Sequence, residues 1–103
     1  MYSEDFQNRL IQLRTKKGSS ARDMSLSIGQ NASYIYNIEN GKALPSMSAF
    51  FFICEYLGVT PSEFFDMDNP DPSKLSPIFA KMKKLSDEEI ESINTIITNL
   101  TKK

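Results

Sequence analysis

The sequence predicts an all-α protein with one main domain. Apolar residues recur at helical spacings, as Phe6, Leu10 and Leu13 do, and no segment shows the strict alternation of a half-buried strand. Small polar residues at helix starts and glycines at helix ends separate these apolar groups. The chain has 103 residues, of which 40% are hydrophobic and 24% charged. This length suffices for one core of ordinary size but not for two.

The composition argues against several functional classes. The chain has one cysteine, Cys54, and no histidine, which excludes an internal disulfide, the usual zinc sites and catalysis by Ser-His-Asp or Cys-His groups. No glycine-rich phosphate loop is visible, so we expect no enzyme activity, no metal and no cofactor. No apolar run approaches the roughly 18 residues of a membrane span, and the polar, acidic first residues resemble no targeting peptide. We therefore expect a cytoplasmic protein without membrane contact.

Residues 1–66 contain start and stop signals for five helices. Residues that can cap a helix start alternate with glycines, which tolerate the left-handed backbone of a helix end. The strongest start signal is Thr60-Pro61-Ser62-Glu63, which combines a cap, a proline at the first helical position and a glutamate three residues after the cap. The other starts are Ser20, Asn31 and Ser46, and the stops are Gly18, Gly29 and Gly41.

The chain changes character after residue 66. Residues 67–77 are polar and rich in proline, which predicts a linker, and residues 78–103 are expected to form a C-terminal helical segment. Ser86 and the acidic residues after it resemble a capping box that opens a last helix. Its apolar residues, spaced by three, four and three, are Ile90, Ile93, Ile97 and Leu100. This stripe fits either a helix that covers its own chain or one that pairs with a second copy.

The helix that Ser46 opens carries more aromatic surface than a small core can cover. Phe50, Phe51 and Phe52 are consecutive, and they project over roughly 200° of a helix at about 100° per residue. At least one of them must leave the core, so Phe51 and Phe52 join the last helix as candidates for a dimer interface. The residues expected in the core by their spacing are Met24, Ile28, Ile35, Ile38, Phe50, Ile53, Cys54 and Leu57.

Residues 20–41 predict two short helices that cross steeply. Such a crossing needs a small residue where the two backbones approach, and Ser25 meets this need. It also needs a residue that tolerates positive φ at the turn, which is Gly29, and apolar residues on the inner face of the second helix, which are Ile35 and Ile38. This arrangement is that of a helix-turn-helix.

Several short motifs between Phe6 and Phe65 extend the pattern. They are Leu10-x-x-Leu13-Arg14, Gly18, Ser20, Met24-Ser25, Ile28-Gly29, Tyr34-Ile35, Ile38-Glu39-Asn40-Gly41-Lys42, Pro45-Ser46 and Leu57-Gly58-Val59. In this combination the sequence resembles the phage-repressor-like (Cro/repressor, XRE) helix-turn-helix transcriptional regulators. The resemblance implies a lambda-repressor-like domain of five helices whose third helix reads the DNA major groove. It also implies an ion pair between Arg14 and Glu39.

The resemblance implies in addition which residues meet DNA. The helix between Asn31 and Gly41 contains no arginine or lysine, so neutral side chains must read the bases, as asparagine reads adenine with two hydrogen bonds. The implied base contacts are Ala32, Ser33, Tyr36 and Asn37, with Asn37 as the first choice. The implied phosphate contacts are Tyr34, Asn40 and Lys42. Two further phosphate candidates follow from the residues themselves: Ser20, at the positive start of a helix, and Arg22, through its charge.

These observations predict a sequence-specific regulator that binds double-stranded DNA as a dimeric repressor on a two-fold symmetric site. The net charge is −1, and residues 1–66 hold six basic and seven acidic residues, so contact with DNA must be local rather than a general attraction. The alternative is a helix-turn-helix scaffold that has lost DNA binding and acts as a protein-interaction module or antagonist of another regulator. The acidic balance and Ala21, where relatives usually carry glutamine, favour this alternative.

Overall fold

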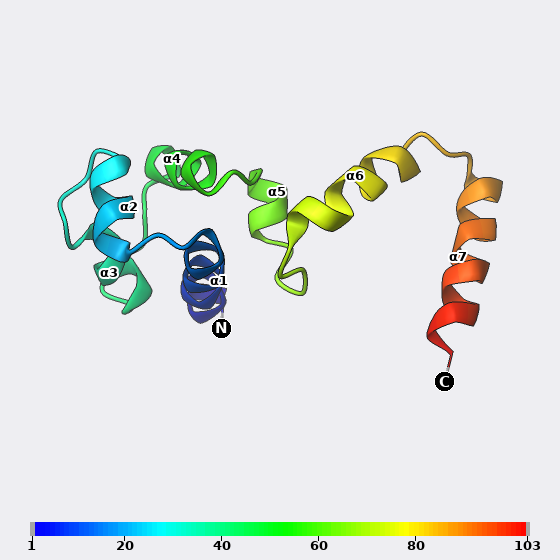
Figure 1. Ribbon diagram of the computed structural model, residues 1–103, viewed down its shortest axis with the longest axis horizontal. Coiled ribbons are helices and arrows are strands. Elements are labelled where there is room, and N and C mark those ends of the chain that lie inside the picture. The colour runs from blue at the N-terminus through cyan, green and yellow to red at the C-terminus, as the bar shows by residue number, and fades with distance from the viewer. Residues whose placement is uncertain (1, 103) are drawn as a thin grey trace. The chain divides into compact units, whose positions relative to one another are not determined.

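The described part of the chain folds into helices. The computed structural model describes residues 2–102, and among these residues it contains seven helices and no strand. The helices are α1 (Tyr2–Lys17), α2 (Ala21–Ser27), α3 (Tyr34–Glu39), α4 (Met47–Leu57), α5 (Pro61–Phe64), α6 (Pro72–Met82) and α7 (Asp87–Thr101) (Figure 1). The all-α prediction, with five helices followed by a helical C-terminal extension, is confirmed.

The helices divide into two compact units, Met1–Pro72 and Ser73–Lys103. The first unit contains α1 to α5, and the second contains α7 and nearly all of α6. The linker expected over residues 67–77 therefore overlaps ordered structure. One reason is that Pro72 occupies the first position of α6, where a helix needs no N–H donor. Another is that Asn69 is buried and its carbonyl accepts a hydrogen bond from Arg9 at 2.8 Å.

Side-chain caps fix several helix starts, as the sequence predicts. The hydroxyls of Ser20 and Ser46 accept hydrogen bonds from the backbone N–H three residues further along, at 3.0 and 3.1 Å. Full capping boxes, in which a glutamate also bonds back to the cap residue, open α5 and α7. These bonds satisfy N–H groups that have no partner within the helix.

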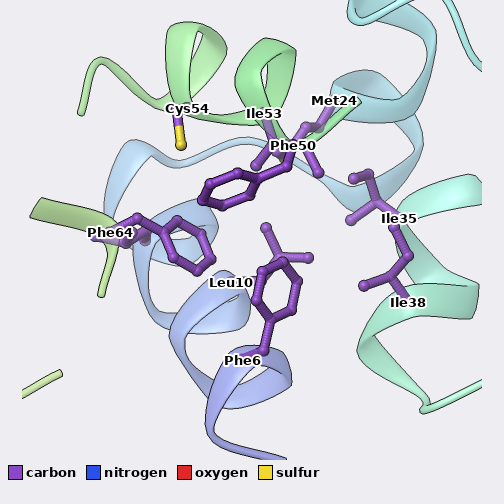
Figure 2. Packing of buried hydrophobic residues seen from close by; sticks show 10 residues of the cluster. Phe6, Leu10, Met24, Ile35, Ile38, Phe50, Ile53, Cys54 and Phe64 are labelled. Atoms are coloured by element: carbon purple, nitrogen blue, oxygen red, sulfur yellow. The ribbon is translucent and has the colours of Figure 1, made fainter. Parts of the chain in front are cut away.

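The core of the first unit lies where all five of its helices, α1 to α5, meet (Figure 2). Phe50 of α4 points into its centre, with ring centroids 5.9 Å from Phe6 and 5.2 Å from Phe64. The rings of Phe50 and Phe64 meet edge to face at 89°, an arrangement that aromatic pairs prefer. Six of the eight expected core residues are buried, and Ile28 and Leu57 are partly buried against the same cluster.

Arg9 is a buried charge that the sequence pattern does not reveal. Its side chain is 2% exposed and lies against the end of α5, where the last carbonyls of a helix lack partners within the helix. The guanidinium donates to the backbone carbonyls of Glu63 at 2.6 Å, of Phe64, and of Asn69 at 2.8 Å. Burial lowers the pKa of Arg9, and the Asp66 carboxylate offsets part of this effect. Arg9 thus connects α1 by hydrogen bonds to the end of α5 and to the turn that follows α5.

The described residues offer little reactive chemistry. Cys54 is buried in the core, and burial raises the pKa of its thiol to about 11. Because the thiolate is the nucleophilic form, this cysteine is inert at neutral pH. Within residues 2–102, no three His, Cys, Asp or Glu side chains are grouped so that they could hold a metal ion. None of the helices in this range has the length and apolar character that crossing a membrane requires.

Candidate DNA-binding surface

Helices α2 and α3 lie next to each other (Figure 1), and the hydroxyl of Ser25 joins them. Ser25 is fully buried. Its hydroxyl donates to the Ala21 carbonyl at 2.7 Å within α2 and accepts from the Ile35 N–H at 2.9 Å near the start of α3. The first N–H groups of a helix have no hydrogen-bond partner within the helix. The Ser25 hydroxyl therefore provides the acceptor that the buried Ile35 N–H needs. The small residue that the sequence predicts here is therefore also a polar link.

The turn between the two helices depends on Gly29. Its φ is +77°, a left-handed conformation that residues with a Cβ adopt reluctantly. The Gln30 N–H then reaches back to the Ser25 carbonyl at 2.9 Å, which satisfies an acceptor at the end of α2. The predicted place of Gly29 in a tight turn is confirmed.

We expect Ser25→Ala to lower the free energy of unfolding by about 1–3 kcal/mol, because it leaves the buried N–H of Ile35 without a partner. Urea unfolding followed by circular dichroism measures the change. Ser27→Ala is the matched control, since Ser27 is exposed in the same helix, and it should change stability by less than about 0.5 kcal/mol. Equal stability of the two variants would show that the Ser25 hydroxyl does not hold α3.

Helix α3 begins later than the sequence suggests, because the Asn31 side chain is engaged in a turn. Its amide oxygen accepts from the N–H and the hydroxyl of Ser33 at 3.1 and 3.0 Å. An asparagine that bonds the backbone two residues ahead forms a turn of its own, and α3 starts only at Tyr34. The expectation that Asn31 caps α3 is wrong. Ala32 and Ser33 lie in the turn before the helix rather than on it.

The outward face of α3 carries neutral polar side chains. Ile35 and Ile38 are buried in the core, so the side chains on the opposite side of the helix point outward, and these are Tyr36, Asn37 and Asn40. Tyr36 is 54% exposed, Asn40 is exposed and Asn37 is half-buried. The face therefore presents amide and phenol groups to the solvent, with Asn37 partly covered.

Two exposed cations and one ion pair set the charge near this face. The Lys42 ammonium lies 5.7 Å from the ring centroid of Tyr36, within range of a cation–π contact, and Arg22 is exposed on α2. The negative charge of the Glu39 carboxylate is balanced by Arg14, whose guanidinium donates to both carboxylate oxygens at 2.7 and 2.9 Å. The hydrogen bond to Glu39 raises the pKa of Arg14. The implied ion pair between α1 and α3 is confirmed.

Three further candidates have partners within the chain. The Asn40 amide donates to the Tyr36 carbonyl at 2.8 Å, and the Ser20 hydroxyl accepts the cap hydrogen bond of α2. Tyr34 packs partly buried against the core, and burial raises the pKa of its phenol. The amide of Asn40 has a second hydrogen and the Ser20 hydroxyl has a proton to donate. The contacts of all the candidate residues with DNA stay predictions.

Comparison with known proteins adds one finding to this geometry. A family model described as a helix-turn-helix domain matches residues 8–69, a range that includes α2, the turn and α3. No curated protein and no solved structure matches the chain. The matched range is more than half of the 103 residues, and helix-turn-helix domains are a recurrent means of binding DNA. The chain therefore belongs to the helix-turn-helix domain family, which indicates a DNA-binding regulator.

Proposed function

We propose that the chain is a sequence-specific transcriptional repressor that binds double-stranded DNA as a dimer in the cytoplasm. The observation that supports this most is the outward face of α3, where Tyr36 and Asn40 are exposed and Asn37 is half-buried. Two cations, Arg22 and Lys42, lie on α2 and just beyond α3. An α-helix fits the major groove of B-DNA. The Ser25 hydroxyl and the Arg14–Glu39 ion pair hold the two ends of α3, so its outward side chains enter the groove in a fixed orientation.

In this proposal Asn37 and Tyr36 are the central base contacts, and Ser33 and Ala32 approach the groove from the turn ahead of α3. Asparagine pairs with adenine through two hydrogen bonds, serine donates or accepts, and the alanine methyl contacts the methyl group of thymine. Tyr36 packs on a base edge or a sugar. Because the four side chains are neutral, the hydrogen-bonding pattern of the bases determines the preferred sequence.

Phosphate groups are contacted by a second set of residues, which positions the protein without reading the sequence. Its members are Arg22, Lys42, Tyr34, Asn40 and Ser20. Two of them are cations, so a dimer neutralises four phosphates through charge. The logarithm of the binding constant should then fall with the logarithm of salt concentration at a slope of about −4 for the dimer.

A dimer supplies the affinity that a single α3 lacks. The six residues of α3 span about 9 Å and reach few base pairs. Two copies related by a two-fold axis reach half-sites about 34 Å apart or a multiple of this distance. Phe51 and Phe52 on α4 remain 48% and 54% exposed and are candidates for the interface. The other candidates are Ile90, Ile93, Ile97 and Leu100 of α7. A bound dimer excludes other proteins from the DNA that it covers, which is repression by occlusion.

Enrichment of bound duplexes from a random library tests the proposal with the full chain. We expect a two-fold symmetric motif. On the enriched duplex, Asn37→Ala should weaken binding by about 1–3 kcal/mol, with most of the loss tied to one base position, because the amide pairs with that base. Mobility shift over a set of duplexes with single base changes measures both the size and the position of the loss.

Two further variants separate base reading from general effects. Asn99→Ala makes the same exchange at an exposed position of α7 and should leave binding unchanged. Lys42→Ala should weaken binding to all duplexes alike and reduce the salt slope by about 1 per protomer. If no duplex is enriched even at low salt, the proposal fails, and the result supports the alternative that the chain is a protein-interaction module. A loss on Asn37→Ala that is equal for all duplexes would refute base reading by Asn37.

A further inference from the structure

Helix α7 carries an apolar stripe from Ile90 to Leu100, whose members are exposed except for the half-buried Ile93. No residue of α7 is buried, although five of its 15 residues are isoleucine or leucine. Ile97 is 46% and Leu100 is 78% exposed. The stripe consists of Ile90, Ile93, Ile97 and Leu100, with Ile96 along one edge. A stripe of this width on one side of a helix is typical of a helix that packs against another helix.

The stripe has the same spacing when it is read from either end. Its intervals are three, four and three residues, which is a short heptad pattern. If two copies of α7 lie antiparallel about a two-fold axis at the level of Thr95, Ile90 of one copy faces Leu100 of the other, and Ile93 faces Ile97. All four side chains of each helix then enter one continuous seam, so a second copy of α7 offers a matching surface.

Ile96 favours an antiparallel pair over a parallel one. At about 100° per residue, Ile96 lies on one edge of the stripe and Asn94 lies on the other. In an antiparallel pair like edges meet, so Ile96 packs beside Ile96 of the second copy close to the two-fold axis. In a parallel pair opposite edges meet, and Ile96 would face the Asn94 amide, which would then lose water without gaining a partner.

The charges at the two ends of α7 favour the same orientation. The helix starts with acidic residues and is followed by a basic one. These residues are Asp87, Glu88, Glu89, Glu91 and Lys102. An antiparallel pair brings the acidic start of each helix near the basic end of the other and also aligns the helix dipoles favourably. A parallel pair would place the four carboxylates of one start within reach of the four of the other, where like charges repel.

We propose that α7 pairs in antiparallel orientation with α7 of a second copy of this chain, with Ile96 close to the two-fold axis. The inference rests on the proposed dimeric regulator and specifies the surface through which its two copies associate.

Cross-linking between two positions of α7 tests the orientation. Full-length chains with Ile90→Cys and with Leu100→Cys carry different tags and are treated with a short bismaleimide, separately and after mixing. In the antiparallel pair the two different positions lie at the same level, whereas like positions lie about 15 Å apart along the axis. We expect at least a tenfold higher yield of cross-linked dimer after mixing than from either variant alone. The unchanged chain is the control for Cys54, which is buried.

The outcomes separate this inference from the proposed function. Cross-linking of each variant with itself, with no gain on mixing, would overturn the antiparallel orientation. A dimer mass in sedimentation without any cross-link would overturn the pairing through α7 and leave the proposed dimer in place through another surface, such as Phe51 and Phe52. A monomer mass would overturn both, and mobility shift on the enriched duplex then reports whether DNA binding itself survives.

A pair of charge substitutions gives a second, independent readout. Ile93→Glu places a carboxylate in the centre of the seam and should reduce the sedimenting mass by half. Thr95→Glu adds the same charge on the opposite side of α7 and should leave the mass unchanged. Equal masses for the two variants would overturn the pairing.

Discussion

Replacing Arg9 with methionine is expected to lower the free energy of unfolding by about 3–5 kcal/mol. The methionine retains most of the apolar stem but removes the donors to three backbone carbonyls at and beyond the end of α5. A hydrogen bond to a charged group contributes about 1.5–3 kcal/mol, and buried acceptors left without donors add a desolvation cost. The total stability of a domain is only about 5–15 kcal/mol, so the loss should be evident in denaturant unfolding.

Two other substitutions define what the Arg9 result means. Arg22→Met removes an exposed arginine and should change stability by less than about 0.5 kcal/mol. Arg9→Lys retains the charge but offers a single nitrogen in place of the planar guanidinium, so it should recover only part of the loss. If Arg9→Met proves as stable as Arg22→Met, Arg9 does not fasten α1 to α5.

Phe50→Ala is expected to destabilise the first unit by about 3–5 kcal/mol, the usual range for a large aromatic side chain removed from a core. The Phe50 ring contacts the rings of Phe6 and Phe64, and its loss leaves a cavity that rigid neighbours fill only in part. Thermal unfolding, analysed at a common temperature, measures the change.

The neighbouring phenylalanine provides the matched control. Phe52 lies two residues further along α4 and is 54% exposed, so Phe52→Ala should cost less than about 1 kcal/mol, because a surface substitution creates no cavity. Similar losses for the two variants would contradict the assignment of Phe50 to the interior and of Phe52 to the surface.

The features of the fold that the sequence predicts correctly depend on residues close together in the chain. A cap such as Ser46 acts on an N–H three residues away, and Gly29 needs only its own backbone conformation. Burial follows helical phase, so the spacing of Ile35 and Ile38 is enough to orient α3 and to identify Tyr36 and Asn37 as outward residues. The resemblance to a known family supplied the one long-range contact that was expected, between Arg14 and Glu39.

The features that the sequence does not reveal depend on distant partners or on competition between local structures. Arg9 and Asn69 are 60 residues apart, and nothing near Arg9 shows that it meets carbonyls rather than water. The available signal for the burial of Arg9 is its position three residues after Phe6, at the edge of the apolar face of α1. Asparagine often caps helices, but the amide oxygen of Asn31 accepts a hydrogen bond from the Ser33 N–H in a turn instead. A cap and this turn compete because both use the same side-chain oxygen.

The two anchors of α3 act independently of its outward side chains. The Ser25 hydroxyl accepts a hydrogen bond from the Ile35 N–H, and Arg14 forms an ion pair with the Glu39 carboxylate. Neither interaction involves the side chains of Tyr36 or Asn37. Mutation of those two outward side chains therefore leaves the scaffold intact. Variation at these two positions is thus decoupled from the folding of the helix that carries them.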